Sequence, residues 1–168
     1  MRDTKAAFEW IVDILRKHNV PFQVTGGLAA RIYGSPRELY DIDIDIPGER
    51  FDEIMLDIEP HIIFAPYQFK DENWDLRLMT LNYAGQHIDI SAAETIKICD
   101  AKSGKWCCDF SDLKRSVEKE VFGMSVPVTC KDDLLAYKSK LSRECDIKDI
   151  KAIKGAGLDA RPDSSLRL

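Results

Sequence analysis

The sequence predicts a single α/β (α+β) domain in which helices flank a mixed β-sheet. With 168 residues, 45% of them apolar, the chain is long enough to bury one well-packed core. Helical and strand patterns alternate without the strict order of βαβ units, which favours a mixed sheet over a purely parallel one. Ala84-Gly85 separates two strand patterns and predicts an antiparallel hairpin.

The first half of the chain begins with a predicted helix over residues 4–18. Ala7, Phe8, Ile11 and Leu15 recur there at helical spacing, and Thr4 is the expected N-cap. The other elements predicted in this half are a strand at 22–24, helix 28–33, strand 40–46, helix 49–58, and strands 61–66, 75–83 and 86–91.

The second half is predicted to contain more helix than strand. Residues 93–99 and 105–110 carry short strand patterns that are ambiguous. A helix at 111–120, a strand at 126–130 and helices at 131–142 and 146–154 follow. We therefore divide the chain into a core (1–130), a C-terminal helical segment packed on it (131–154) and a flexible tail (155–168).

Charge and cysteine content narrow the class of protein. The net charge is -5 and there is no arginine-rich run, so a long nucleic-acid backbone is a poor partner. The five cysteines show no Cys-x-x-Cys spacing, which indicates reduced thiols and a cytoplasmic protein. No apolar run approaches the roughly 20 residues that span a membrane.

Three carboxylates alternate with isoleucine in the strand predicted at 40–46. Because side chains alternate along a strand, Asp41, Asp43 and Asp45 point to one face and the isoleucines to the other. Asp41 and Asp43 can hold Mg²⁺, one ion or two, for phosphoryl transfer. Asp45 is expected at the rim. Solvated acids on an exposed edge strand are the alternative.

Two further features extend this cluster. Gly26-Gly27, between a strand and a helix, can bring backbone amides close to phosphates, although such a pair is often only a turn. Asp89 lies between isoleucines on a later strand. If that strand is a neighbour of the strand with Asp41 and Asp43, Asp89 can bind the metal or accept a proton.

Together these motifs resemble the DNA polymerase β-like nucleotidyltransferase superfamily: Gly-Gly, thirteen intervening residues, an acidic pair, and then a third acid. Residues 36–50 are similar to small bacterial enzymes that modify aminoglycosides or lincosamides. Residues 126–150 are similar to the helical segment of small nucleotidyltransferases, including those of toxin–antitoxin operons. The resemblance covers residues 22–153 and implies the mixed sheet of the nucleotidyltransferase type.

The resemblance also implies roles for residues. Asp41, Asp43 and Asp89 would be catalytic and bind two Mg²⁺ ions, and Gly26 and Gly27 would cradle the triphosphate of an NTP. Arg37 and Lys138 would contact phosphates. For Arg37 a loop-anchoring salt bridge is the alternative, and for Lys138 a solvated helix face. Asp146 and Asp149 are expected to be structural.

The implied activity is Mg²⁺-dependent transfer of a nucleoside monophosphate from NTP to an acceptor hydroxyl, with release of pyrophosphate. A small molecule such as an aminoglycoside or lincosamide is the favoured acceptor. Transfer to tRNA or protein, and a non-catalytic nucleotide-binding module, are the alternatives. The acceptor pocket is expected to be completed by a homodimer, by a helical partner protein, or by residues 92–124.

Overall fold

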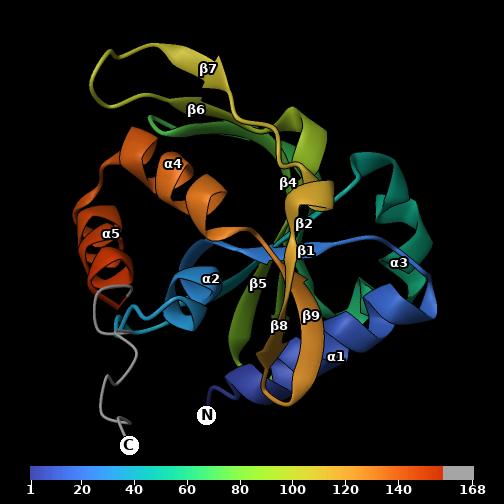
Figure 1. The fold of residues 1–168 in the computed structure, drawn as a ribbon. Helices are drawn as coiled ribbons and strands as arrows, with labels where there is room; N and C mark the ends of the chain where they lie inside the picture. The colour runs from blue at the N-terminus through green and yellow to red at the C-terminus, as the bar shows by residue number, and fades with distance from the viewer. Residues whose placement is uncertain (157–168) are drawn as a thin grey trace, which may run out of the picture.

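The computed structural model describes residues 1–156, and within them it contains five α-helices and nine β-strands (Figure 1). The helices are α1 (Thr4–Lys17), α2 (Gly26–Ile32), α3 (Phe51–Ile58), α4 (Lys131–Leu141) and α5 (Glu144–Ala156). The strands are β1 (Gln23–Thr25), β2 (Asp41–Ile46), β3 (Ile62–Lys70), β4 (Trp74–Tyr83), β5 (Gln86–Ala92), β6 (Lys97–Cys99), β7 (Trp106–Cys108), β8 (Val117–Val121) and β9 (Met124–Val128).

All the strands belong to one mixed sheet, as the sequence predicted. Its order is β7-β6-β4-β5-β2-β1-β9-β8, and β3 pairs with β4 outside this path. Strand β2 runs parallel to β5 and antiparallel to β1, while β4 and β5 form the antiparallel hairpin expected at Ala84-Gly85. The pairing of β2 with β5 joins segments that lie more than 40 residues apart in sequence.

One face of the sheet is apolar and carries the main core. Ile42, Ile44 and Ile46 of β2 are fully buried, because the period of two places every isoleucine of the acidic strand on this face. They share one core cluster with Phe8 of α1 and Phe51 of α3, and both helices lie along this side of the sheet in Figure 1. Each such side chain contributes about 1.5–3 kcal/mol when it is fully buried.

Helix α4 covers part of the opposite face. Leu141 belongs to a second apolar cluster with Leu76 of β4 and with Ile96 and Ile98, at the end of the sheet where β6 and β4 pair. Tyr137 packs against the same cluster and accepts a hydrogen bond from Trp74 Nε1 at 2.8 Å. These contacts fix the C-terminal half of α4 to the sheet, and Leu134, nearer its N-terminus, is buried in the main core.

Several predicted elements differ from the structure. The helix predicted at 111–120 is wrong, because residues 117–121 form β8. The alternating sequence Val-Glu-Lys-Glu-Val and the turn at Phe122-Gly123, where both φ angles are positive, favour a hairpin with β9. The N-cap of α1 is Asp3, whose carboxylate accepts from Ala6 N at 2.9 Å. Thr4 instead donates to Gln86.

Other boundaries shift by a few residues. Strand β3 continues to Lys70, beyond the predicted end at residue 66. Helix α2 begins at Gly26 itself. Helix α5 runs to Ala156, so Gly155 and Ala156 are helical and not part of the predicted tail. The rest of that tail, residues 157–168, lies outside the described residues.

A buried ion cluster joins α4, α5 and the loop before β2. Lys138 Nζ lies 2.9 Å from Asp149 Oδ2 and 3.2 Å from Asp146 Oδ1, and the Lys138 side chain is only 2% exposed. Ser35 donates to Asp149 at 2.6 Å, and Arg37 donates to both carboxylate oxygens of Asp149 at 3.2 and 3.3 Å. The structural role expected for Asp146 and Asp149 is confirmed, and a solvated position for Lys138 is wrong.

These contacts decide the charge of Asp149. Burial alone would raise its pKa, but hydrogen bonds from Arg37, Ser35 and Lys138 outweigh burial and hold the pKa of Asp149 below its ordinary value. The carboxylate is therefore ionised and paired with two cations. Arg143 completes the cluster by contacting Asp146 at 2.7 and 3.0 Å.

We expect Asp149→Ala to lower the free energy of unfolding by about 3–5 kcal/mol, because it leaves the buried Lys138 ammonium with one partner fewer. Glu144→Ala is the matched control, since the Glu144–Lys148 pair on the same helix is exposed. That control should lower the free energy of unfolding far less, because solvent screens an exposed ion pair. Urea unfolding measures both, and equal losses would contradict this account.

Candidate active site

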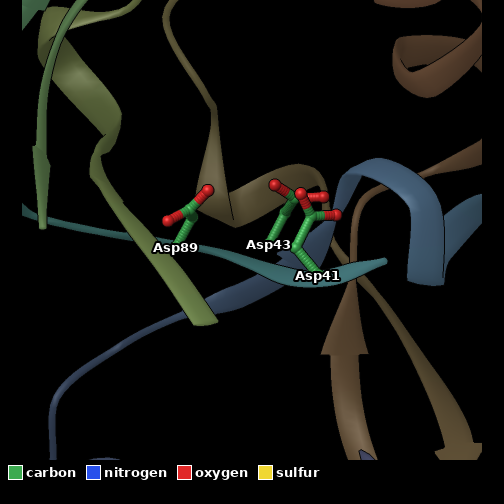
Figure 2. A group of neighbouring side chains, drawn as sticks. All are labelled: Asp41, Asp43 and Asp89. Atoms are coloured by element: carbon green, nitrogen blue, oxygen red, sulfur yellow. The ribbon is translucent and has the colours of Figure 1, made fainter. Parts of the chain in front are cut away.

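Three carboxylates meet on the face of the sheet opposite the isoleucine core. Asp41 and Asp43 come from β2 and Asp89 from β5, and the parallel register places Asp43 directly opposite Asp89. One oxygen of each carboxylate lies within 4.8 Å of the others. Figure 2 shows the three side chains projecting to the same side of the two strands. The expectation that Asp89 joins the acidic pair is confirmed.

Burial and mutual repulsion determine the electrostatics of the cluster. Burial, and then the charges of Asp41 and Asp89, raise the pKa of Asp43 from 3.8 to about 7, although Gly27 N donates to Asp43 at 3.2 Å. Burial also raises the pKa of Asp89, against a hydrogen bond that Thr80 donates at 2.7 Å. Three carboxylate oxygens this close fit the ligand set of Mg²⁺.

The position of Asp43 leaves room only for glycine at residue 26. The φ angle of Gly26 is +60°, and a Cβ built there would lie 1.8 Å from Asp43 Oδ2. At Gly27 a Cβ would lie 3.1 Å from Nη2 of Arg37. The glycine pair therefore lets the start of α2 approach the carboxylates, and it brings Arg37 beside them.

Asp45 is not the rim residue that the sequence predicted. Its side chain is buried, because a loop after β7 covers this end of β2, and Ser111 donates to it at 2.6 Å. Burial raises the pKa of Asp45 to about 6, against hydrogen bonds from Ser111 and Gln23. Gln23 donates to Ser111 through its amide nitrogen, while its buried Oε1 has no hydrogen-bond partner among residues 1–156.

Arg37 and Lys138 both lie at the edge of the site. The salt bridge considered for Arg37 is present, since its guanidinium pairs with Asp149. The Lys138 ammonium pairs with two carboxylates, which uses two of its three N–H donors. Three cations of the ion cluster (Arg37, Lys138 and Arg143) face two anions, so this edge of the site keeps a positive excess.

A cavity of about 910 Å³ lies above the carboxylates, between the sheet and α4. Its wall includes all seven residues expected to act in catalysis or nucleotide binding: Gly26, Gly27, Arg37, Asp41, Asp43, Asp89 and Lys138. Residues 109–112 also line it, so the segment 92–124 contributes to the wall as expected.

Sequence reasoning missed three polar groups in this cavity. Thr80 could have been found, because the two-residue turn at Ala84-Gly85 sets the hairpin register that places Thr80 opposite Asp89. Ser111 and Tyr137 carried no such signal. Their positions depend on how a loop and a helix pack over the sheet.

Comparison with known families agrees with this geometry. The sequence model of the aminoglycoside-2''-adenylyltransferase family matches residues 8–153. The chain belongs to this family. It is therefore a nucleotidyltransferase, and the resemblance inferred from the Gly-Gly and aspartate motifs is confirmed. No match was found among curated proteins.

Solved structures share the fold of this family member. A candidate nucleotidyltransferase of Thermotoga maritima is 24% identical with a TM-score of 0.68, covering 96% of this chain and 97% of its own. The lincosamide antibiotic adenylyltransferase LnuA, bound to lincomycin, is 17% identical with a TM-score of 0.62, covering 92% and 98%. ANT(2'')-Ia in complex with adenylyl-2''-tobramycin is 16% identical with a TM-score of 0.54, covering 92% of each chain.

The raised pKa of Asp43 predicts a stability that depends on both pH and metal. The folded state holds a proton on Asp43 that the unfolded chain releases near pH 3.8, so stability present below that pH is lost as pH rises through about 7. Mg²⁺ should therefore raise the melting temperature more at about pH 8 than at about pH 5.

Asp43→Asn isolates this effect. We expect it to raise the stability of the metal-free protein at about pH 8 by roughly 1–3 kcal/mol and to abolish the Mg²⁺-dependent shift. Asp52→Asn, on the exposed side of α3, is the control. It should change neither the stability of the metal-free protein nor the Mg²⁺-dependent shift in melting temperature. Thermal melts with EDTA and with Mg²⁺ measure both. An unchanged Mg²⁺ shift in Asp43→Asn would contradict the assignment.

Proposed function

We propose that this protein transfers a nucleoside monophosphate from an NTP to a hydroxyl group of a small molecule, with Mg²⁺, and releases pyrophosphate. The observation that carries the proposal is the position of Asp41, Asp43 and Asp89, whose oxygens lie within 4.8 Å of one another in a cavity bordered by Gly26 and Gly27. Phosphoryl transfer needs this combination of metal ligands and phosphate-facing amides.

Asp41, Asp43 and Asp89 would hold Mg²⁺, which would neutralise phosphate charge and help activate the attacking hydroxyl. The acceptor oxygen forms a bond to the α-phosphorus, and the bond from that phosphorus to the bridging oxygen breaks, so pyrophosphate leaves with the electron pair. Asp89 would also accept the proton that the hydroxyl loses, a role that its raised pKa, caused by burial, supports.

The remaining polar groups are assigned to the triphosphate. Gly26 and Gly27 offer backbone amides next to Asp43, as the close approach of α2 allows. Arg37 borders the same side of the cavity. Lys138 keeps one N–H donor beyond its two ion pairs, and we assign it to a phosphate oxygen.

A small-molecule acceptor is favoured over tRNA or protein by the size of the cavity. A volume of about 910 Å³ is within the usual range for small-ligand pockets. The solved relatives support the same class, since LnuA is bound to lincomycin and ANT(2'')-Ia to adenylyl-2''-tobramycin. We therefore propose an antibiotic of the aminoglycoside or lincosamide type, with ATP as the first donor to test.

We expect Asp41→Asn and Asp43→Asn each to lower kcat for nucleotidyl transfer by about 10³-fold or more, because metal and phosphate charge is no longer balanced. Pyrophosphate release from each NTP, with Mg²⁺ and a panel of both antibiotic classes, measures the activity. Circular dichroism checks the fold. Asp52→Asn should retain full activity, and unchanged transfer by both cluster variants would refute the proposal.

A further inference from the structure

The strand register places aromatic side chains in line with the catalytic carboxylates. Reading across the sheet on the cavity face, Asp43 pairs with Asp89, Asp89 with Thr80, and Thr80 with Phe64 of β3. The neighbouring row on this face also ends in an aromatic residue of β3, because Ser91 pairs with Leu78 and Leu78 pairs with Tyr67. Phe64 and Tyr67 line the same cavity as the carboxylates.

These side chains form a continuous apolar wall. Phe64 is 55% exposed, and its ring lies 5.8 Å from that of Tyr67, which in turn lies 6.2 Å from that of Phe69. Strand β3 pairs only with β4 among the described strands, so no strand covers its outer side. Exposed aromatic rings that border a reaction cavity are suited to an apolar ligand surface.

Phe110 adds a fourth aromatic ring from a fixed loop. Asp109 N donates to Ile96 O at 2.9 Å, Ser111 N donates to Ala93 O at 3.0 Å, and the Ser111 hydroxyl donates to Asp45. The residues on both sides of Phe110 are therefore anchored, yet the Phe110 side chain is 58% exposed and lines the cavity. An exposed ring held in this way costs little entropy to bury against a ligand.

Most of the acids around this wall are paired with a cation or buried. Outside the metal cluster, Asp109 forms an ion pair with Lys140, and Asp133 with Arg115 at 2.7 Å. Asp45 is buried and hydrogen-bonded. Among the described residues that line the cavity, Asp112 is then the one exposed acid without an ionic partner. A ligand with several ammonium groups would find few carboxylates to pair with.

We propose that the part of the acceptor that does not react is apolar and carries at most one positive charge, and that it binds against Phe64, Tyr67 and Phe110. This inference rests on the proposed function and selects, within it, an amphipathic hydroxyl compound over a polycation. Phe64 lies two strands from Asp89, so the apolar part lies about 10 Å from the reacting hydroxyl.

The test compares two acceptors named above. Lincomycin, the compound bound to LnuA, and tobramycin, the aminoglycoside of the ANT(2'')-Ia complex, are the two probes. By their chemical structures, the first is an amphipathic thioglycoside with one basic amine and the second carries several amines. We expect kcat/KM for lincomycin to exceed that for tobramycin by about tenfold or more. The KM for lincomycin should change less than about twofold between roughly 50 and 500 mM NaCl, because salt does not screen apolar contacts.

Phe64→Ala and Phe110→Ala should each raise the KM for lincomycin by about tenfold and leave Mg²⁺–NTP binding, measured by calorimetry, unchanged. Leu56→Ala is the matched control, because Leu56 is an 89% exposed apolar side chain on α3, away from the cavity. It should leave KM unchanged.

Three results would overturn this inference and leave the proposed function standing. The first is transfer to tobramycin as efficient as transfer to lincomycin, and the second is an unchanged KM for lincomycin in both aromatic variants. The third is a protein that binds Mg²⁺–NTP but does not bind lincomycin. Sedimentation that reveals a dimer, dissociated by Phe64→Ala with unchanged KM, would make the wall a subunit interface and also overturn it. Failure to bind Mg²⁺–NTP at all would instead refute the proposed function.

Discussion

Parallel pairing between β2 and β5 sets Asp43 directly opposite Asp89, and every other part of the site is arranged around that contact. Three carboxylates this close repel one another, and burial adds to the cost, as the raised pKa of Asp43 records. The cost is tolerated because the reverse side of the same strands carries Ile42, Ile44, Ile88 and Ile90, all fully buried. Apolar packing on one face holds the acids together on the other.

The two ends of the cavity contain opposite kinds of groups. Near α2 and α4 the glycine pair, Arg37 and Lys138 supply donors and positive charge, which suits phosphates. Near β3 and Phe110 the wall is aromatic, and Asp109 and Asp133 are paired with cations. Strands β5 and β4 lie between these ends, so one row of paired residues runs from Asp43 through Asp89 and Thr80 to Phe64.

The local parts of this arrangement could be predicted from the sequence. The alternation in Asp41–Ile46 determined which face carries the acids, and Gly26-Gly27 marked the close approach of α2. Long-range contacts could not be predicted in the same way. Asp45 was wrongly predicted to lie at the rim, because Ser111, the residue that donates a hydrogen bond to it, lies in a loop 66 residues away. The helix expected at 111–120 failed because pairing with β9 outweighed local helical preference.

The position of β3 has a consequence for how this protein can change over generations. Since β3 pairs with β4 alone among the described strands, its side chains can be replaced without disturbing the strands that hold the carboxylates. The same is true of Phe110, because its neighbours Asp109 and Ser111 anchor the loop through backbone and side-chain contacts. If the proposed acceptor wall is correct, substitutions at this edge would alter which compounds are modified while the carboxylate cluster stays intact, so a related chain would acquire resistance to a new drug by a few substitutions there.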